Sequence, residues 1–182
     1  MAWEHGNLKT GTNTYYNITC IRKKAKKVYR NPRLRRWQQM LKAYKYRIYP
    51  TNEQKEQIAK TFGCCRFVYN RTLAYRKEAY EKEKKTVNKT NCNNYCNQVL
   101  KKEYGWLKEV DKFALTNAIY NMDAAYQKFF KEHTGYPKFK SKHDGHKSYT
   151  TNFTNGNITA DFDGGKVKLP KLKEVKAKLH RN

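Results

Sequence analysis

The sequence has few acidic residues and no long apolar run. Of its 182 residues, 15 are Asp or Glu and 40 are Lys or Arg, which gives a formal charge of +25. No apolar run exceeds three residues, so we expect neither a membrane-spanning helix nor the apolar stretch of a secretion signal. This charge argues against a metabolic enzyme with a near-neutral surface and favours a polyanionic partner.

Residue patterns that carry catalysis or bind metals are also scarce. The sequence has no Gly-rich phosphate loop, no recognisable Ser/His/Asp arrangement and no C-x-x-C pair, and its five cysteines predict reduced thiols in a cytosol. Cys92 and Cys96 share an apolar helical stripe, which favours core packing over metal binding. His143 and His146 lack a second ligand pair nearby. Because the acids after residue 131 are too few for a two-metal nuclease, we predict no catalytic residue, metal or cofactor.

Aromatic residues, in contrast, are abundant. They make up 14% of the chain, including 15 Tyr, 8 Phe and 3 Trp. Disordered basic tails are poor in aromatic residues, whereas these rings can build a core and also stack on bases. We therefore expect a folded, basic nucleic-acid-binding protein whose length suits one domain, or one domain split by an insert.

The first 39 residues differ from the rest. They hold ten Lys or Arg and one acid, Glu4. Such a segment is typical of a basic nucleic-acid arm, but a folded pattern begins abruptly at Met40, which favours an in-frame extension upstream of the true start. We predict that residues 1–39 are a basic extension, flexible or upstream of the start codon.

Strand patterns begin after Met40 and return near the end of the sequence. Residues 41–49 alternate apolar and cationic side chains, as a strand with one core face does. Residues 148–153 and 158–161 flank a turn that contains Asn155-Gly156, which predicts a β-hairpin. Lysines also alternate with apolar residues at 166–169 and again at 175–180.

A lone strand is not stable, so the first strand needs the later ones as partners. We predict that residues 40–50 and 135–182 together form a small antiparallel β-barrel with a lysine-rich outer face. The fold class is then α+β: a wedge-type split barrel with an inserted helical domain, residues 51–134.

The insert carries helix signals throughout. Thr51 and Gln54 form a capping box, and Gly63 predicts a stop before a longer helix to about residue 85. Two helices joined at a glycine resemble a helix-turn-helix pair. A polar connector, 88–94, leads into a third helix, and Asp111 caps a fourth that runs to about residue 131.

Candidate nucleic-acid contacts are the cationic and aromatic side chains of these elements. Lys and Arg on strand faces can neutralise phosphates and make affinity depend steeply on salt. The segment 136–142 alternates rings and cations, so it can stack on bases, or plug the junction between barrel and helices. The polar side of the helix at 64–85 can enter a groove or be an ordinary solvated face. The contacts predicted in this way are Lys42, Lys45, Arg47, Arg66, Asn70, Arg76, Tyr136, Lys138, Phe139, Lys140, Lys142, Lys168 and Lys171.

Five sequence blocks, in order and at similar spacing, carry a resemblance to a known family. From Met40 to Asn182 the chain resembles the N-terminal part of the TnpB (OrfB) accessory transposases of bacterial insertion sequences. The blocks are Met40–Pro50, Phe62–Asn70, Trp106–Leu115, Gly135–Lys140 and Lys168–Leu172.

The resemblance implies an architecture and partners. TnpB-like proteins are RNA-guided DNA nucleases related to type V CRISPR effectors, and a helical recognition domain splits their wedge barrel. That lobe holds a guide RNA and reads a short DNA motif, whereas base pairing reads the target. By position, Lys112, Phe113, Thr154 and Asn155 would help to read the motif, and Thr116 stands where relatives can carry Gln.

We expect RNA and DNA as partners, with full-length TnpB or other element-encoded proteins as further ones. The expected location is the bacterial cytoplasm, with no membrane and no small-molecule substrate.

The sequence also departs from the family pattern. Family members continue into a RuvC-like nuclease and a zinc ribbon, whereas this sequence stops at Asn182. We therefore expect a truncated TnpB-like protein that binds nucleic acid without nuclease activity. Lys173-Glu174-Val175 stands where the family has Gly-Trp-Val. Three alternatives stay open: a stand-alone helix-turn-helix DNA-binding regulator, a decayed non-functional remnant, and half of a two-part enzyme.

Overall fold

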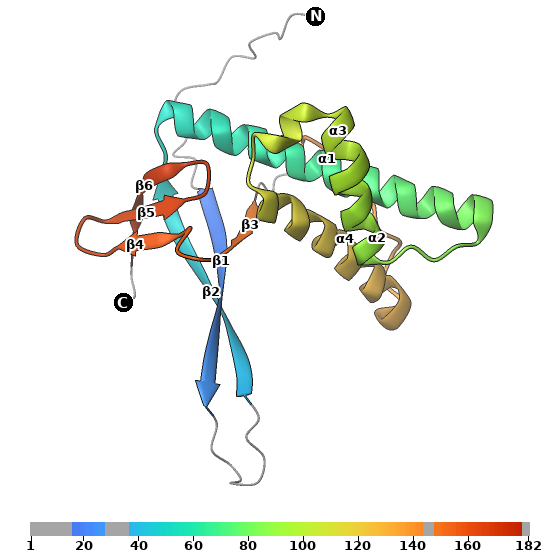
Figure 1. The fold of residues 1–182 in the computed structure, drawn as a ribbon, viewed down its shortest axis with the longest axis horizontal. Helices are drawn as coiled ribbons and strands as arrows, with labels where there is room; N and C mark the ends of the chain where they lie inside the picture. Colours follow the sequence, from blue (N-terminus) through green and yellow to red (C-terminus); the bar gives the residue numbers. More distant parts are fainter. Residues whose placement is uncertain (1–15, 28–36, 144–147, 180–182) are drawn as a thin grey trace, which may run out of the picture.

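The computed structural model describes residues 16–27, 37–143 and 148–179, and for 16–27 and 37–46 it describes the backbone. This part of the chain is an α+β fold in which one six-stranded sheet lies beside a set of helices (Figure 1). None of the described helices combines the length and the apolar character needed to cross a membrane.

The sheet joins strands from before and after the helices. Its order is β3-β1-β2-β6-β5-β4. β1 pairs antiparallel with β2 and parallel with β3, while β6 pairs antiparallel with β2 and β5. The strands are β1 (Tyr16–Lys27), β2 (Trp37–Tyr49), β3 (Tyr149–Asn152), β4 (Thr159–Asp161), β5 (Lys166–Leu169) and β6 (Lys173–Lys178).

β1 lies inside the segment that we expected to be flexible or upstream of the start. Its backbone instead pairs with β2 along its whole length, from Tyr16↔Ile48 to Lys27↔Trp37. The strand has a period-two pattern, with Ile18 and Cys20 alternating with polar residues. We did not recognise this pattern because the basic residues that follow it dominate the composition of the segment. Residues 1–15 and 28–36 of the same segment lie outside the described residues.

The turn predicted at Asn155-Gly156 is present, but the strands on its two sides do not pair with each other, so the predicted hairpin is wrong. Asn155 and Gly156 both have positive φ (49° and 71°), and the Asn157 amide donates to the Thr154 carbonyl. The strands on either side nevertheless lie at opposite ends of the sheet order, because β3 pairs with β1 and β4 pairs with β5. The chain therefore crosses the sheet between them.

The sheet also differs from the antiparallel barrel that we predicted. β1 and β3 run parallel, and β3 and β4 are the two ends of the strand order, so the described pairings leave the sheet open. The lysine-faced strands themselves are confirmed. Val167 and Leu169 of β5 are buried, as are Val175 and Ala177 of β6, while the lysines between them are exposed.

The long helix α1 (Asn52–Glu83) shows that the expected break at Gly63 is wrong. The predicted capping box is confirmed, because the Thr51 and Gln54 side chains each accept from the other's backbone amide. Gly63 lies within the helix and lacks a positive φ. A helix-interior glycine costs about 1 kcal/mol relative to alanine, and burial of Ile58, Cys64 and Val68 on either side outweighs this cost.

The remaining helices fold back against α1. α2 (Lys89–Tyr95) begins at the Asn88 cap, within the segment predicted as a connector. A short π-helix (Cys96–Leu100) then shifts the helical register and leaves Val99 exposed. α3 (Lys101–Glu103) and a 3-10 turn (Gly105–Lys108) lead to α4 (Lys112–Glu132), which begins at the predicted Asp111 cap.

Two hydrophobic cores result, and α1 contributes to both. The helical core includes Val68 of α1 with Leu100, Ile119 and Met122. The sheet core includes Ile58 of α1 with residues of β2, β5 and β6. Cys65 packs against both cores, so this part of α1 is the structural link between them.

The substitution Gly63→Ala tests the unbroken helix. A Cβ added at Gly63 meets nothing within 4 Å, so we expect a gain of about 0.5–1 kcal/mol in the free energy of unfolding. Urea unfolding followed by circular dichroism measures it. Gly156→Ala is the control, because a φ of +71° strains a side chain, and this variant should lose stability. A helix that broke at Gly63 in a left-handed turn would instead make Gly63→Ala destabilising.

Candidate nucleic-acid interface

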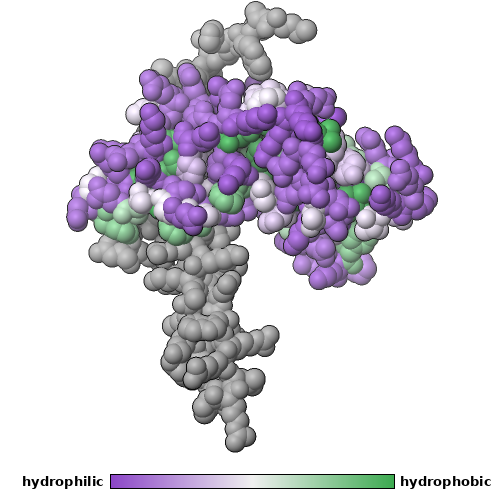
Figure 2. All heavy atoms as spheres, viewed as in Figure 1, coloured by the Kyte–Doolittle hydropathy of each residue, from purple (hydrophilic) through white to green (hydrophobic). Residues whose placement is uncertain are grey.

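Eight of the 17 predicted contact residues line two places on a strongly hydrophilic surface. Figure 2 shows hydrophilic residues over most of the visible face, with small hydrophobic patches between them. One place, named here the cationic cleft, lies between α1, α4, the segment 140–142 and the start of β3. The other, named the lysine hollow, lies where α4 begins. The cleft is lined by Phe62, Cys65, Arg66, Ala114, Ala118, Asn121, Lys140, Ser141, Lys142, Ser148, Tyr149 and Thr150.

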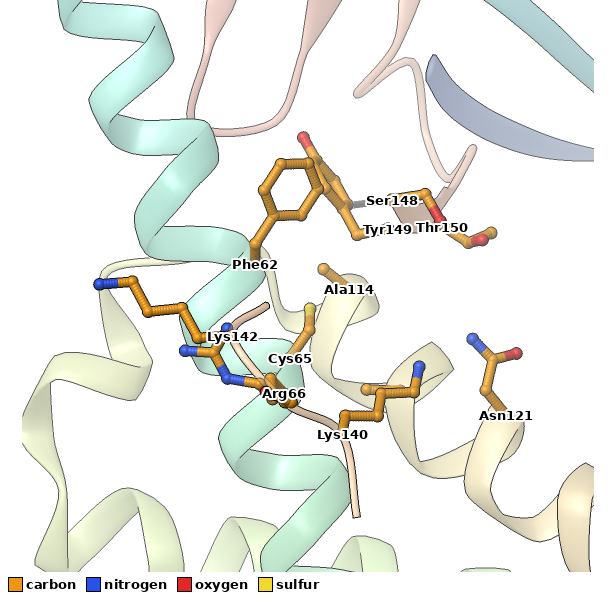
Figure 3. Close-up of a pocket in the computed structure, with 12 residues that line it drawn as sticks. Phe62, Cys65, Arg66, Ala114, Asn121, Lys140, Lys142, Ser148, Tyr149 and Thr150 are labelled. Atoms are coloured by element: carbon orange, nitrogen blue, oxygen red, sulfur yellow. The ribbon is translucent and has the colours of Figure 1, made fainter. Parts of the chain in front are cut away.

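The rim of the cationic cleft is positively charged. Arg66, Lys140 and Lys142 line the cleft together with neutral residues, and none of the lining residues is acidic (Figure 3). Among the described residues, neither Arg66 nor Lys142 has an acidic side chain within ion-pair distance. Like charges that share a small region repel each other, so an anion that enters the cleft is stabilised.

Apolar and aromatic side chains also line the cleft. Phe62 of α1 meets Tyr149 of β3 edge to face, with ring centroids 5.9 Å apart. Burial raises the pKa of the Cys65 thiol to about 12 and also raises the pKa of the Tyr149 hydroxyl. Both groups are therefore neutral near pH 7, and the charge of the cleft comes from its rim.

Asn70 holds the segment 140–142 against α1. Its side-chain amide donates to the Lys140 carbonyl at 3.0 Å and accepts from the Lys140 amide at 2.8 Å. The Lys140 ammonium also lies over the Tyr69 ring, 4.6 Å from its centroid. We predicted a nucleic-acid contact at Asn70, but in the structure its amide positions the cationic segment.

Just before this segment in the sequence, Tyr136 is fixed and Phe139 is exposed. The Tyr136 hydroxyl shares a hydrogen bond with that of Tyr126, and its ring meets Phe129 edge to face. Tyr136 therefore closes the junction with α4, although 43% of its surface is accessible. Phe139, at 58% exposed, has a larger free face for stacking, and Lys138 beside it is exposed.

Arg76, a predicted nucleic-acid contact, is used inside the protein. Its guanidinium pairs with Asp123 at 2.8 Å and lies over the Tyr126 ring, 4.2 Å from the centroid. Its side chain is only 11% exposed. The ion pair joins α1 to α4, and the Arg76 charge is already neutralised there.

The lysine hollow gathers residues that are far apart in the sequence. Lys112 and Phe113 begin α4, Thr154 and Asn155 form the turn after β3, and Lys171 lies in the turn between β5 and β6. These are the predicted motif-reading residues together with a predicted phosphate contact. The hollow is lined by Lys108, Val110, Asp111, Lys112, Phe113, Thr154, Asn155, Asn157, Pro170 and Lys171.

Asp111 fixes the geometry of this hollow. One carboxylate oxygen caps α4 by accepting from the Phe113 amide at 3.1 Å, and the other accepts from the buried Thr151 hydroxyl of β3. Asn117 adds a second link to β3, because its amide donates to the Thr150 carbonyl at 2.9 Å. Thr116 is less available for a base contact, because its hydroxyl donates to the Lys112 carbonyl at 3.1 Å.

The other predicted contacts lie outside both places. Arg47 and Lys168 are exposed on β2 and β5. Lys42 and Lys45 belong to β2, and their side chains lie outside the described part of the structure. We missed Asn121 in the cleft and Lys108 in the hollow. Lys108 is separated from Lys112 by Glu109, Val110 and Asp111, so the local charge pattern gave no signal for it.

Cys64, Cys92 and Cys96 act as buried apolar residues. Burial raises the pKa of Cys64 and of Cys92 to about 11, and it also raises that of Cys96. Metal binding needs the thiolate form, which these environments disfavour. In the part of the chain that the structure describes, no group of three His, Cys, Asp or Glu side chains is arranged to hold a metal ion. Asp144 to His146 lie outside that part.

Comparison with known proteins adds to this geometry. The family HTH_OrfB_IS605, described as a helix-turn-helix domain, matches residues 40–85. A relative from Streptomyces pristinaespiralis, named an RNA-guided DNA endonuclease, is 36% identical over 101 residues, and InsQ of Escherichia coli, with the same description, is 26% identical over 133. The chain belongs to the OrfB (TnpB) family. The residues matched by the OrfB model hold the second part of β2 and the whole of α1.

The aligned regions cover only part of this chain and part of each relative. The aligned part is 55% of this chain and 25% of the Streptomyces protein, and 72% of this chain and 32% of InsQ. This OrfB-family chain thus spans about a quarter to a third of those two relatives. Virulence protein VsdF of Salmonella dublin is 38% identical over 99 residues, which are 50% of this chain and 83% of that protein.

The substitution Asn70→Ala should release the segment that carries Lys140. Both hydrogen bonds to the Lys140 backbone are lost without a change in charge, so we expect faster hydrogen exchange at the Lys140 amide. Mass spectrometry or NMR measures this rate. Asn97→Ala is the control, since Asn97 accepts only from Lys101 elsewhere on the surface. An unchanged rate in Asn70→Ala would show that the two hydrogen bonds do not hold the segment.

The raised thiol pKa values predict slow alkylation. With pKa values of about 11 to 12, the thiolate fractions of Cys64, Cys65 and Cys92 at pH 8 are about a hundredfold or more below that of an unperturbed thiol with a pKa of 9.0. Peptide mapping after iodoacetamide treatment should therefore show slow labelling at pH 8, which rises as the pH increases and is fast in urea. Rapid labelling of these three residues in the folded protein at pH 8 would contradict the prediction.

Proposed function

We propose that this OrfB-family chain is a transposon-associated nucleic-acid-binding lobe, which contacts guide-type RNA and the DNA motif beside a target. The observation that carries the proposal is the cationic cleft. Arg66 and Lys142 share its rim without an acidic partner among the described residues, so a phosphate would neutralise charges that the protein leaves uncompensated.

The lysine hollow supports the DNA part of the proposal. Base readout needs side chains with hydrogen-bonding groups that are held at fixed positions near backbone-binding cations. Thr154 and Asn155 are exposed at a turn with defined φ angles, and Lys112 and Lys171 lie beside them. Asp111 links α4 to β3 and keeps these groups together.

The RNA part of the proposal rests on the family and on exposed rings. The relatives' names describe RNA-guided DNA endonucleases. Phe139 offers a free aromatic face between Lys138 and Lys140, an arrangement that suits single-stranded bases and their phosphates. We also propose that this lobe corresponds to the family's wedge and recognition domains, and that it binds nucleic acid without cutting it.

The double variant Arg66→Gln/Lys142→Gln tests the cleft. The probes are a 20-nucleotide single-stranded RNA of mixed sequence and a DNA duplex of the same sequence, and fluorescence anisotropy is measured across a salt titration. Each lost phosphate contact lowers the salt slope by about 0.9 for duplex DNA and about 0.7 for a single strand. We expect the slope to fall by about 1.8 or about 1.4, depending on which probe the cleft holds.

Lys82→Gln/Lys85→Gln is the matched control. It removes the same charge from two exposed residues, Lys82 in the last turn of α1 and Lys85 just beyond the helix. If the cleft variant and this control lose equal affinity, the cleft has no specific part in binding. If the unaltered protein binds neither probe at physiological salt, the proposed function itself is wrong.

A further inference from the structure

The β1–β2 pair continues beyond the six-stranded sheet as a two-stranded ribbon. β1 pairs with β3 only as far as Ile21, and β2 pairs with β6 only at Arg47–Tyr49, whereas β1 and β2 stay paired as far as Lys27↔Trp37. Figure 1 shows this end of both strands projecting away from the other strands and the helices. The ribbon is defined here as Arg22–Lys27 with its partners Trp37–Lys42.

The ribbon is basic and carries no acid. Five of the six residues Arg22–Lys27 are cationic, and Lys42 lies opposite Arg22. Because strand residues alternate between faces, the register assigns Arg22, Lys24, Lys26 and Lys42 to one face and Lys23 and Lys27 to the other. One face therefore has four cations, and the other has two with Leu41 and Trp37.

We infer that this ribbon is a binding site for double-stranded DNA and lies in the major groove. The inference rests on the proposed function for the class of ligand, but the lysines that test it, Lys24 and Lys26, lie outside the family match, which begins at residue 40. The major groove is about 12 Å wide and admits a two-stranded β-ribbon. Alternate residues of a strand are about 6.8 Å apart, which equals about two base-pair steps of 3.4 Å.

The geometry favours DNA over double-stranded RNA. The major groove of A-form RNA is deep and too narrow for protein elements to read, whereas the B-form groove is open. The ribbon extends over six residue pairs beyond the wider sheet, which is about 20 Å and long enough to follow part of one groove. It therefore adds a duplex contact away from the cationic cleft and the lysine hollow.

The test compares two faces of the same strand at equal charge. Full-length protein with Lys24→Gln/Lys26→Gln is compared with Lys23→Gln/Lys27→Gln and with the remote control Lys82→Gln/Lys85→Gln. The probes are a 20-base-pair DNA duplex and an RNA duplex of the same sequence, and anisotropy gives the affinity across a salt titration. Circular dichroism melts confirm that each variant is folded.

The inference predicts that the loss of affinity depends on which face of the ribbon is altered and on whether the probe is DNA or RNA. The Lys24/Lys26 variant should lower the DNA salt slope by about 1.8, with a smaller change for the RNA duplex and for the other two variants. An equal loss on both faces, a loss no larger than that of the remote control, or an equal loss for RNA would overturn it. If the ribbon variants match the control while Arg66→Gln/Lys142→Gln loses affinity, the inference fails and the proposed function stands.

Discussion

The packing of α1 against two separate cores fixes the arrangement of the whole described chain. Ile58 is buried among sheet residues, and Val68, ten residues later, is buried among helices. At the start of α1, Gln54 donates to the carbonyls of Leu172 and Glu174, so the helix also holds the β5–β6 turn. Because one rigid helix bears all these contacts, the sheet and the helices cannot shift independently. The cationic cleft depends directly on this rigidity, since its walls come from both parts.

Ion pairs and hydrogen bonds between polar groups also fix the arrangement of the elements. They determine which cationic side chains remain free to bind a ligand. The Arg76–Asp123 ion pair and the Asn70 amide both join distant segments, and each removes a polar group from the exposed surface. Among the described residues, Arg66 and Lys142 have no such acidic partner. The charge of +25 is therefore a poor guide to binding by itself. Binding of a polyanion depends on which cationic side chains the fold brings close together without an acidic partner.

The sequence predicted local features well and distant partners poorly. The capping box at Thr51, the cap at Asp111 and the buried faces of β5 and β6 each depend on residues a few positions apart. Strand pairing depends on the whole chain, so a good turn at Asn155-Gly156 did not reveal that β3 pairs with β1. Packing on both sides overrode the helix-breaking tendency of Gly63. Lys112, Phe113, Thr154 and Asn155, for which the family resemblance implies motif reading, line one hollow. The internal roles of Asn70 and Arg76 depend on partners remote in sequence.

The crossing of the chain between β3 and β4 has a consequence for how the protein folds. β1 and β2 pair locally, and the helices between Asn52 and Glu132 contact one another, but Ile18↔Tyr149 and Ile48↔Ala177 join strands more than a hundred residues apart. Contacts between distant residues form slowly, because the intervening chain must first be ordered. During synthesis, the ribbon and helices are therefore available before the sheet is complete. The lysine hollow, which needs the turns after β3 and β5, assembles last, so its occupation by a ligand would report that folding has finished.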